Sequence, residues 1–237
     1  GCEFLEKNHD QDNWLLHLET FDPHEPFYVP QKYLDMYPEE YDGKHFDWPR
    51  GAVEEEPEEI AHCRRQYQAL VTMCDHSLGR ILDMMDKYQM WDDTMLIVGT
   101  DHGFLLAEHG YWGKNQMPYY NEVAHTPFFV WDPRYKEQGV RRQSLVQMID
   151  WMPTILKYFY LPIPKDVQGS PMDEIIKNDT PSREYALYGV FSGHVNITDG
   201  SYAYMRAPLT EKADEVYNYT LMPNHMNKRF DPEELKG

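Results

Sequence analysis

The spacing of apolar residues predicts one long helix and one buried strand near the middle of the chain. Apolar side chains recur every three or four residues over Ile60–Met85, which is the pattern of an amphipathic helix. The next apolar run, Thr94–Thr100 (TMLIVGT), is continuous and has the length of a strand. Such runs are typical of strands buried on both faces of a sheet, so a helix followed by one predicts the α/β class.

The same patterns predict three further elements. Leu15–Phe21 (LLHLETF) is a short apolar run that stops before a proline, so we interpret it as a strand that ends in a loop. Thr126–Trp131 (TPFFVW) repeats the strand pattern. Val146–Tyr160 is predicted to be helical, with Pro153 either kinking the helix or starting its main part.

A proline-rich connection, Leu161–Lys165, separates two predicted parts of the chain. Residues 1–162 are expected to form an α/β domain. Residues 163–237 are expected to form a small C-terminal subdomain. Within it, Tyr185–Phe191 and Tyr202–Arg206 resemble antiparallel strands around an Asp-Gly turn.

Composition and charge limit the classes of molecule that the protein is expected to bind. The 237 residues are 41% hydrophobic and 14% aromatic, which is typical of a globular protein. The formal net charge of −18 argues against nonspecific nucleic-acid binding, which depends on Lys and Arg neutralising phosphates. An acidic surface also repels anionic substrates at long range, so any such substrate requires local cations. The sequence contains no apolar run of the ~18 residues that a membrane-spanning helix needs.

The strongest candidate chemistry lies directly after the predicted strand at Thr94–Thr100, where Asp101 and His102 follow it. Ligand sites in α/β sheets lie outside the carboxyl ends of strands, and a carboxylate with an imidazole is ordinary ligand chemistry for a divalent ion. The alternative is that Asp101 caps the next element and His102 is a surface or core histidine. The pair alone does not decide between them.

Two further residues can lie near Asp101 and His102, at the same edge of the predicted sheet. Lys114 lies in a glycine-punctuated loop twelve residues beyond His102, where it can bend back toward the ion or remain a surface lysine. His24 lies at the end of the strand predicted at Leu15–Phe21. A neutral His24 can donate to a substrate oxygen, and a protonated one can act as a general acid to the leaving group.

Several segments together resemble the sulfatase family of the alkaline phosphatase superfamily. They occur in the family order and include the C-terminal subdomain: Leu15–Pro30 (LLHLETFDPHEPFYVP), Thr100–Lys114 (TDHGFLLAEHGYWGK), Tyr120–Pro133 (YNEVAHTPFFVWDP), Ile149–Leu156 (IDWMPTIL) and Val195–Arg206 (VNITDGSYAYMR). The resemblance implies an α/β sandwich with a mostly parallel central sheet flanked by helices, plus a small antiparallel C-terminal subdomain.

The resemblance also implies a role for each candidate residue. Asp101 and His102 match the second pair of metal ligands, Lys114 the lysine that contacts the transferred sulfuryl or phosphoryl oxygens, and His24 the histidine near the leaving group. For His109, in the Glu-His-Gly triplet, we favour a supporting role. The implied cofactor is one divalent metal ion, which is calcium, or manganese or zinc because imidazole favours softer ions.

The family's nucleophile is not in this sequence. Sulfatases use a Cys or Ser in a C/S-x-P-x-R motif, converted to formylglycine, and no such motif occurs here. The N-terminal aspartate pair that supplies the other metal ligands is likewise absent. We therefore expect a piece of a longer protein that lacks its N-terminal part and is inactive when isolated. An uncovered sheet edge in such a piece invites self-association.

The expected substrate is a small-molecule or glycan sulfate ester. A phosphonate monoester or phosphodiester hydrolase of the same superfamily is the first alternative, and a non-catalytic binder of sulfated glycans is the second. The sequence leaves the localisation and the natural substrate open.

Overall fold

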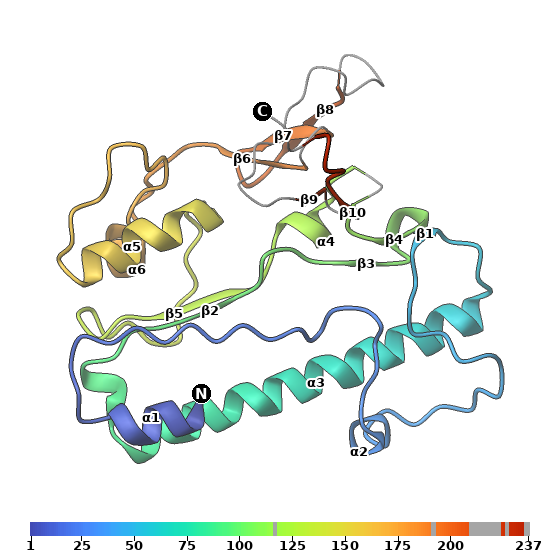
Figure 1. Ribbon diagram of the computed structural model, residues 1–237, viewed down its shortest axis with the longest axis horizontal. Coiled ribbons are helices and arrows are strands. Elements are labelled where there is room, and N and C mark those ends of the chain that lie inside the picture. The colour runs from blue at the N-terminus through green and yellow to red at the C-terminus, as the bar shows by residue number, and fades with distance from the viewer. Residues whose placement is uncertain (116–117, 191–192, 209–223, 226–227, 235–237) are drawn as a thin grey trace.

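The longest element is α3, Pro57–Lys87, which extends along the base of the molecule in Figure 1. Its first turn is stabilised by Pro57 at the start and by a capping box, in which Glu56 and Glu59 each bond the other's backbone amide. Cys63, Ala69 and Leu70 on one face are fully buried, and Ile60 and Tyr67 are partly buried against them. The helix predicted from apolar periodicity over Ile60–Met85 is therefore confirmed.

The computed structural model describes residues 1–115, 118–190, 193–208, 224–225 and 228–234. The remaining helices are α1 (Cys2–Asn8), α2 (Gln31–Leu34), α4 (Asn121–Ala124), α5 (Trp151–Tyr158) and α6 (Asp173–Asn178), with 3-10 turns at Met90–Asp92, Glu108–Gly110 and Met148–Asp150. The strands are β1 (Gly51–Ala52), β2 (Leu96–Gly99), β3 (Leu105–Leu106), β4 (Tyr111–Gly113), β5 (Phe128–Trp131), β6 (Ala186–Gly189), β7 (Val195–Thr198), β8 (Ala203–Arg206), β9 (Asn224–His225) and β10 (Lys228–Arg229).

The main core lies between α3 and segments that precede and follow it in the sequence. Phe27, Val29, Tyr33 and Trp112 pack there against the buried side chains of α3. Phe27 makes edge-to-face contacts with Tyr67 of α3 and with Phe104. The loop that carries His24 is therefore fixed by burial of a residue three positions along the chain.

The two strands predicted in the middle of the chain, β2 and β5, are present and pair with each other. The pairing is antiparallel, with Leu96 opposite Trp131 and Gly99 opposite Phe128. Gly99 allows close packing of Trp151 from α5, since a Cβ at position 99 would lie 2.7 Å from the ring of that tryptophan. The expected mostly parallel central sheet is not shown, since every strand pair that the structure describes is antiparallel.

The strand predicted at Leu15–Phe21 does not form. This segment is extended above α3 in Figure 1 but carries no ladder hydrogen bonds to another described strand. Its Leu16 packs with Leu5 and Met85, whereas Leu15 and Phe21 are exposed. An extended segment becomes a strand only when a neighbour pairs with it, and apolar alternation does not supply that neighbour.

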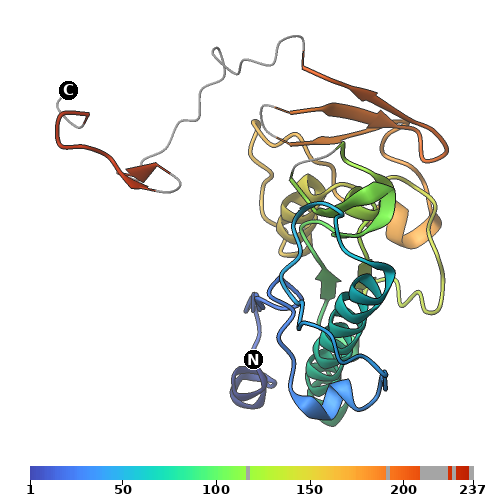
Figure 2. The same cartoon turned by 90° about the vertical axis from the view of Figure 1, so that its right-hand side faces the viewer.

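The C-terminal region contains a three-stranded antiparallel sheet in the order β6-β7-β8, which lies at the opposite end of the molecule from α3 in Figures 1 and 2. Asp199 fixes the turn between β7 and β8, because its carboxylate accepts hydrogen bonds from the amides of Ser201 and Tyr202. The two predicted strands form as β6 and β8, although Phe191 lies outside the described residues. They do not pair with each other, because β7, which was not predicted as a strand, lies between them and meets β8 at the Asp-Gly turn. The boundary predicted at residue 162 stays a prediction.

Pro153 lies in the first turn of α5, where a helix needs no amide from it. Of the two alternatives for this proline, it therefore lies at the start of the main helix.

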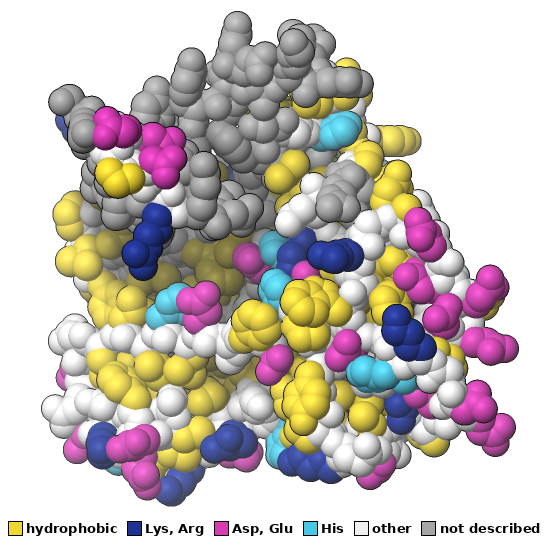
Figure 3. Space-filling view, turned by 45° about the vertical axis from the view of Figure 1, so that its right-hand side comes forward, with side chains coloured by type: hydrophobic (Ala, Val, Ile, Leu, Met, Phe, Trp, Pro, Cys, Tyr) yellow, Lys and Arg dark blue, Asp and Glu magenta, His cyan; other side chains and the backbone are white. Residues whose placement is uncertain are grey.

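Hydrophobic side chains are exposed on one face of the molecule, as Figure 3 shows. Within the described ranges, no helix is both long and apolar enough to cross a lipid bilayer.

Candidate functional site

Asp101 and His102 lie on the turn that leaves β2, as predicted. This turn is held against α4, because Gly103 donates its amide hydrogen to the carbonyl of Val123 at 2.8 Å. A side chain at position 103 would not fit, since its Cβ would lie 1.9 Å from the carbonyl oxygen of Glu122. The glycine after the Asp-His pair thus permits the backbone contact that positions both side chains.

The two candidate ligands point toward each other. The Asp101 Oδ1 atom accepts a hydrogen bond from the His102 amide at 3.0 Å, and its Oδ2 atom lies 3.3 Å from His102 Nε2. His102 Nδ1 lies 3.0 Å from the carbonyl oxygen of Gly103, and only a protonated Nδ1 can donate to it. In the neutral ring this leaves the Nε2 lone pair beside the carboxylate, which is the arrangement of a metal-binding histidine.

This pair fits the chemistry of a divalent ion but supplies only part of a coordination shell. The Asp101 side chain is 75% exposed and that of His102 is 29% exposed, so both donors can be reached from solvent. Among the residues that the structure describes, no group of three or more His, Cys, Asp or Glu side chains is arranged to hold a metal ion. Further ligands must come from elsewhere if an ion binds here.

Lys114 and His24 come together although 90 residues separate them, with Lys114 Nζ 2.8 Å from His24 Nε2. The same ammonium donates to Glu25 Oε2 at 3.0 Å. His24 Nδ1 in turn lies 2.6 Å from the carbonyl oxygen of Glu25, to which it donates. Because an ammonium has no acceptor, His24 Nε2 must be the acceptor in the first contact, so His24 is neutral here.

The β3–β4 hairpin delivers Lys114 to this position. Leu106 pairs with Trp112, whose indole is buried and donates to Glu55 at 2.7 Å. The connecting turn is unusual, since Ala107 and His109 both have positive φ, at 75° and 56°. Arg64 of α3 supports the turn, because its Nε atom donates to the Leu106 carbonyl at 2.7 Å.

One aromatic ring connects the two residue pairs. Phe104 directly follows the Asp101-His102-Gly103 turn, and Lys114 Nζ lies 5.7 Å from the centre of its ring. A cation over an aromatic face is attracted by the ring quadrupole. The lysine therefore rests on the residue that follows the candidate metal-binding turn.

His109 has partners of its own. Its Nε2 atom lies 3.1 Å from Glu122 Oε1, and its ring stacks on Tyr120 at 3.9 Å between centres. Both partners belong to α4 or to the residue just before it. Burial raises the pKa of the neighbouring Tyr119 phenol, and the negative charge of Asp101 raises it further. These contacts are consistent with the supporting role proposed for His109, which stays a prediction.

Glu25 follows His24 directly in the Leu15–Pro30 motif, and the sequence alone indicates no role for it. The only available signal was its position next to a candidate histidine. Its importance depends on the hairpin that carries Lys114, which brings a cation within hydrogen-bonding distance of a carboxylate 89 residues away. Sequence patterns alone do not reveal such a contact.

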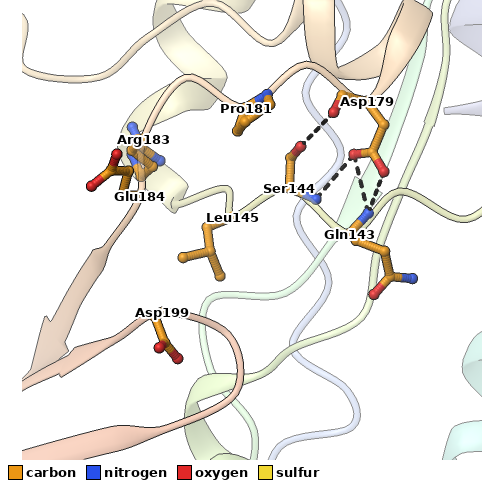
Figure 4. Close-up of a pocket in the computed structure, with 8 residues that line it drawn as sticks. All are labelled: Gln143, Ser144, Leu145, Asp179, Pro181, Arg183, Glu184 and Asp199. Atoms are coloured by element: carbon orange, nitrogen blue, oxygen red, sulfur yellow. Dashed lines mark hydrogen bonds between the residues drawn. The ribbon is translucent and has the colours of Figure 1, made fainter.

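An open surface pocket lies away from these residues, near the C-terminal sheet. It has a volume of about 270 Å³ and is lined by Gln143, Ser144, Leu145, Asp179, Pro181, Arg183, Glu184 and Asp199. As Figure 4 shows, Asp179 accepts hydrogen bonds from the amides of Gln143 and Ser144, which lower the pKa of its carboxyl group. These contacts join two backbone segments, so we assign the pocket a structural origin and no catalytic residue.

Two family models match the chain. The model described as Sulfatase matches residues 2–160, and the model described as N-sulphoglucosamine sulphohydrolase, C-terminal, matches residues 107–236. The first match includes His24, Asp101, His102, His109 and Lys114.

Individual proteins agree with this assignment. An arylsulfatase of Clostridium perfringens is 25% identical over 223 residues, which cover 84% of this chain and 46% of that protein. A solved structure in complex with its substrate D-glucosamine-2-N,6-O-disulfate is 26% identical, with a TM-score of 0.56, and the match covers 62% of this chain and 32% of that one.

A phosphonate monoester hydrolase from Silicibacter pomeroyi is also similar. It is 25% identical, with a TM-score of 0.59, and the match covers 65% of this chain and 35% of that one. The chain thus spans between about a third and a half of the length of these proteins. The order of its motifs, the fold and the matched models lead to one conclusion, that the chain belongs to the sulfatase family.

Proposed function

We propose that this chain is the C-terminal portion of a metal-dependent hydrolase of sulfate esters, and that it supplies part of the active site. The observation that carries the proposal is the contact between Lys114 and His24 at 2.8 Å, with the Lys114 ammonium over Phe104, which follows the Asp101-His102-Gly103 turn in the sequence. In this proposal, residues 1–162 belong to the catalytic domain and residues 163–237 to a C-terminal subdomain. Strands of the missing portion would join β2 and β5 in a mostly parallel sheet.

Asp101 Oδ2 and His102 Nε2 are the atoms that would hold a divalent ion. Such an ion would supply Lewis-acid chemistry, that is, positive charge close to the oxygens of the ester. The contact from His102 Nδ1 to the Gly103 carbonyl orients the ring for this role. Calcium, manganese and zinc all remain candidates for the ion.

Lys114 and His24 would contact the substrate. An ammonium has three hydrogens, and contacts with His24 and Glu25 use two of them, so one is left for an ester oxygen within the described surroundings. An ester held by Lys114 would lie next to the His24 ring. If His24 takes up a proton from solvent at Nε2, it no longer accepts from Lys114, so that contact breaks. The ring can then donate the proton to the departing alcohol oxygen and return to its neutral form.

The substrate class follows from the same residues and from the relatives. Lys114 provides one cation for an anionic group, and the solved relative described above binds a sulfated glucosamine. We therefore propose a sulfated sugar or another sulfate ester as substrate. The similarity to a phosphonate monoester hydrolase favours a second candidate, hydrolysis of a phosphonate monoester or phosphodiester at the same residues.

The test uses a longer protein that contains this chain, because the similar proteins are about two to three times as long as the part that matches it. Initial rates are measured on an aryl sulfate, a phosphate diester and a phosphonate ester, with calcium, manganese or a chelator. We expect metal-dependent turnover of the sulfate that Asp101→Ala lowers by at least roughly a hundredfold. Asp92→Ala is the matched control, since Asp92 forms only an exposed ion pair with Lys136.

Faster turnover of a phosphorus ester than of the aryl sulfate would support the same catalytic residues but assign the protein to the second reaction class. No turnover of any ester by correctly matured protein would refute the hydrolase proposal. The chain of residues 1–237 by itself is expected to be inactive, because the nucleophile motif is absent from its sequence.

A further inference from the structure

Glu25 introduces a negative charge at the one lysine proposed to bind the substrate anion. Its Oε2 atom lies 3.0 Å from Lys114 Nζ and 3.3 Å from His24 Nδ1. The side chains of Lys114 and Glu25 are only 11% and 15% exposed. The pair is thus held in a partly desolvated position, where charges interact more strongly than at an open surface.

The net charge of this group of three residues follows from its hydrogen bonds. Lys114 contributes one positive charge and Glu25 one negative charge. His24 contributes none, because its Nε2 atom accepts a hydrogen bond from the ammonium. The group is therefore neutral overall, although it offers a cationic N–H to a ligand.

We propose that Glu25 is a specificity-determining residue that favours monoanionic esters, such as sulfate monoesters, over dianionic esters, such as phosphate monoesters. This inference rests on the proposed function, in which the ester oxygens bind Lys114. An oxygen bonded to the free N–H of Lys114 would lie about 5 Å from the Glu25 carboxylate, given ordinary hydrogen-bond lengths. Repulsion from Glu25 at that distance grows with each negative charge on the ligand, so a dianion is penalised more than a monoanion.

Glu25 also has a positioning role that does not depend on ligand charge. It holds the Lys114 ammonium over Phe104 and against the His24 ring, so the free N–H has a defined direction. A variant that removes the charge and one that shifts it separate these two roles. Glu25→Gln retains the shape and loses the charge, whereas Glu25→Asp retains the charge on a shorter side chain.

The test is a binding measurement on the chain of residues 1–237, which requires no turnover. Phenyl sulfate, a monoanion, and phenyl phosphate, a dianion at about pH 8 because its second pKa is near 6, are titrated while the ε-carbon NMR signal of Lys114 is followed. We expect Glu25→Gln to raise the affinity for phenyl phosphate relative to phenyl sulfate by about tenfold after screening by salt. Glu25→Asp is expected to retain the discrimination of the unmodified chain.

Glu3→Gln is the matched control, since it makes the same change in net charge and removes only an exposed pair with Lys7. An equal change for both ligands in Glu25→Gln, or no change, would overturn the inference and leave the anion site in place. If neither ligand moves the Lys114 signal in the unmodified chain or in either Glu25 variant, both this inference and the proposed role of Lys114 are refuted.

Discussion

Asp150 and Arg183 form a buried ion pair that joins the start of α5 to the segment before β6. Arg183 Nη2 donates to Asp150 Oδ1 at 2.6 Å, and Arg183 Nη1 donates to Oδ2. The same carboxylate accepts hydrogen bonds from the amides of Gln147 and Ser170, both at 2.8 Å. One fully buried acid thus connects its own segment, Gln147–Asp150, to the segments that carry Ser170 and Arg183, and it raises the pKa of the Arg183 guanidinium.

The first prediction concerns this pair. Arg183→Ala leaves Asp150 buried without its cation, so the free energy of unfolding should fall by about 3–5 kcal/mol. Lys136→Ala is the control, because it breaks an exposed pair with Asp92 and should cost at most about 1 kcal/mol. Urea denaturation of the chain measures both. Similar stabilities for the two variants would contradict the role assigned to the buried pair.

A second prediction compares two glycines. Gly103→Ala places a Cβ 1.9 Å from the Glu122 carbonyl oxygen and should destabilise the chain by roughly 1–3 kcal/mol, since the turn or α4 must move. Gly79→Ala, inside α3 with nothing within 4 Å of the added Cβ, should instead stabilise it by about 0.5–1 kcal/mol. Thermal or urea denaturation should show changes of opposite sign in the free energy of unfolding of the two variants. An unchanged stability of Gly103→Ala would contradict the close contact between this turn and α4.

The third prediction concerns thiol reactivity. Burial in α3, with Asp47 and Glu55 nearby, raises the pKa of Cys63 to about 12. Because the pKa is raised, the thiol stays protonated and unreactive at pH values where an ordinary cysteine ionises. Iodoacetamide at about pH 8.5, near the ordinary cysteine pKa, should therefore modify the partly exposed Cys2 and spare Cys63. In urea all three cysteines should react, and rapid modification of Cys63 in the folded chain would contradict its burial.

The fourth prediction is self-association of the chain. In the described part, β2 and β5 pair only with each other, and Phe129 of β5 is 66% exposed. Open edges and exposed apolar side chains favour pairing with another copy. Sedimentation velocity should show a mass that rises with protein concentration, and Phe129→Lys should lower it more than Tyr160→Lys, a control that is 90% exposed after α5. A monomer at every concentration would refute this prediction.

Local patterns were sufficient for the elements whose formation depends on short-range order. The apolar spacing over Ile60–Met85 predicts α3 because a helix satisfies its own hydrogen bonds, and β2 and β5 were predicted from runs dense in β-forming residues. Leu15–Phe21 has a similar composition but is not a strand, because strand formation requires a partner that the segment does not contain. The direction of pairing also depends on which strands lie side by side. In the described residues β2 has only β5 beside it, and that pair is antiparallel, whereas a mostly parallel sheet was expected.

For the candidate site, the sequence by itself determined the family and the identity of the candidate residues. The Asp-His pair after a strand, the Lys114 loop and the His24 segment are all readable from order and spacing. The contacts of Lys114 with His24 and Glu25 were decided only by the tertiary structure, since 90 and 89 residues separate the partners. Long-range contacts depend on how the β3–β4 hairpin and Phe27 pack against α3, and no local pattern in the chain encodes that packing.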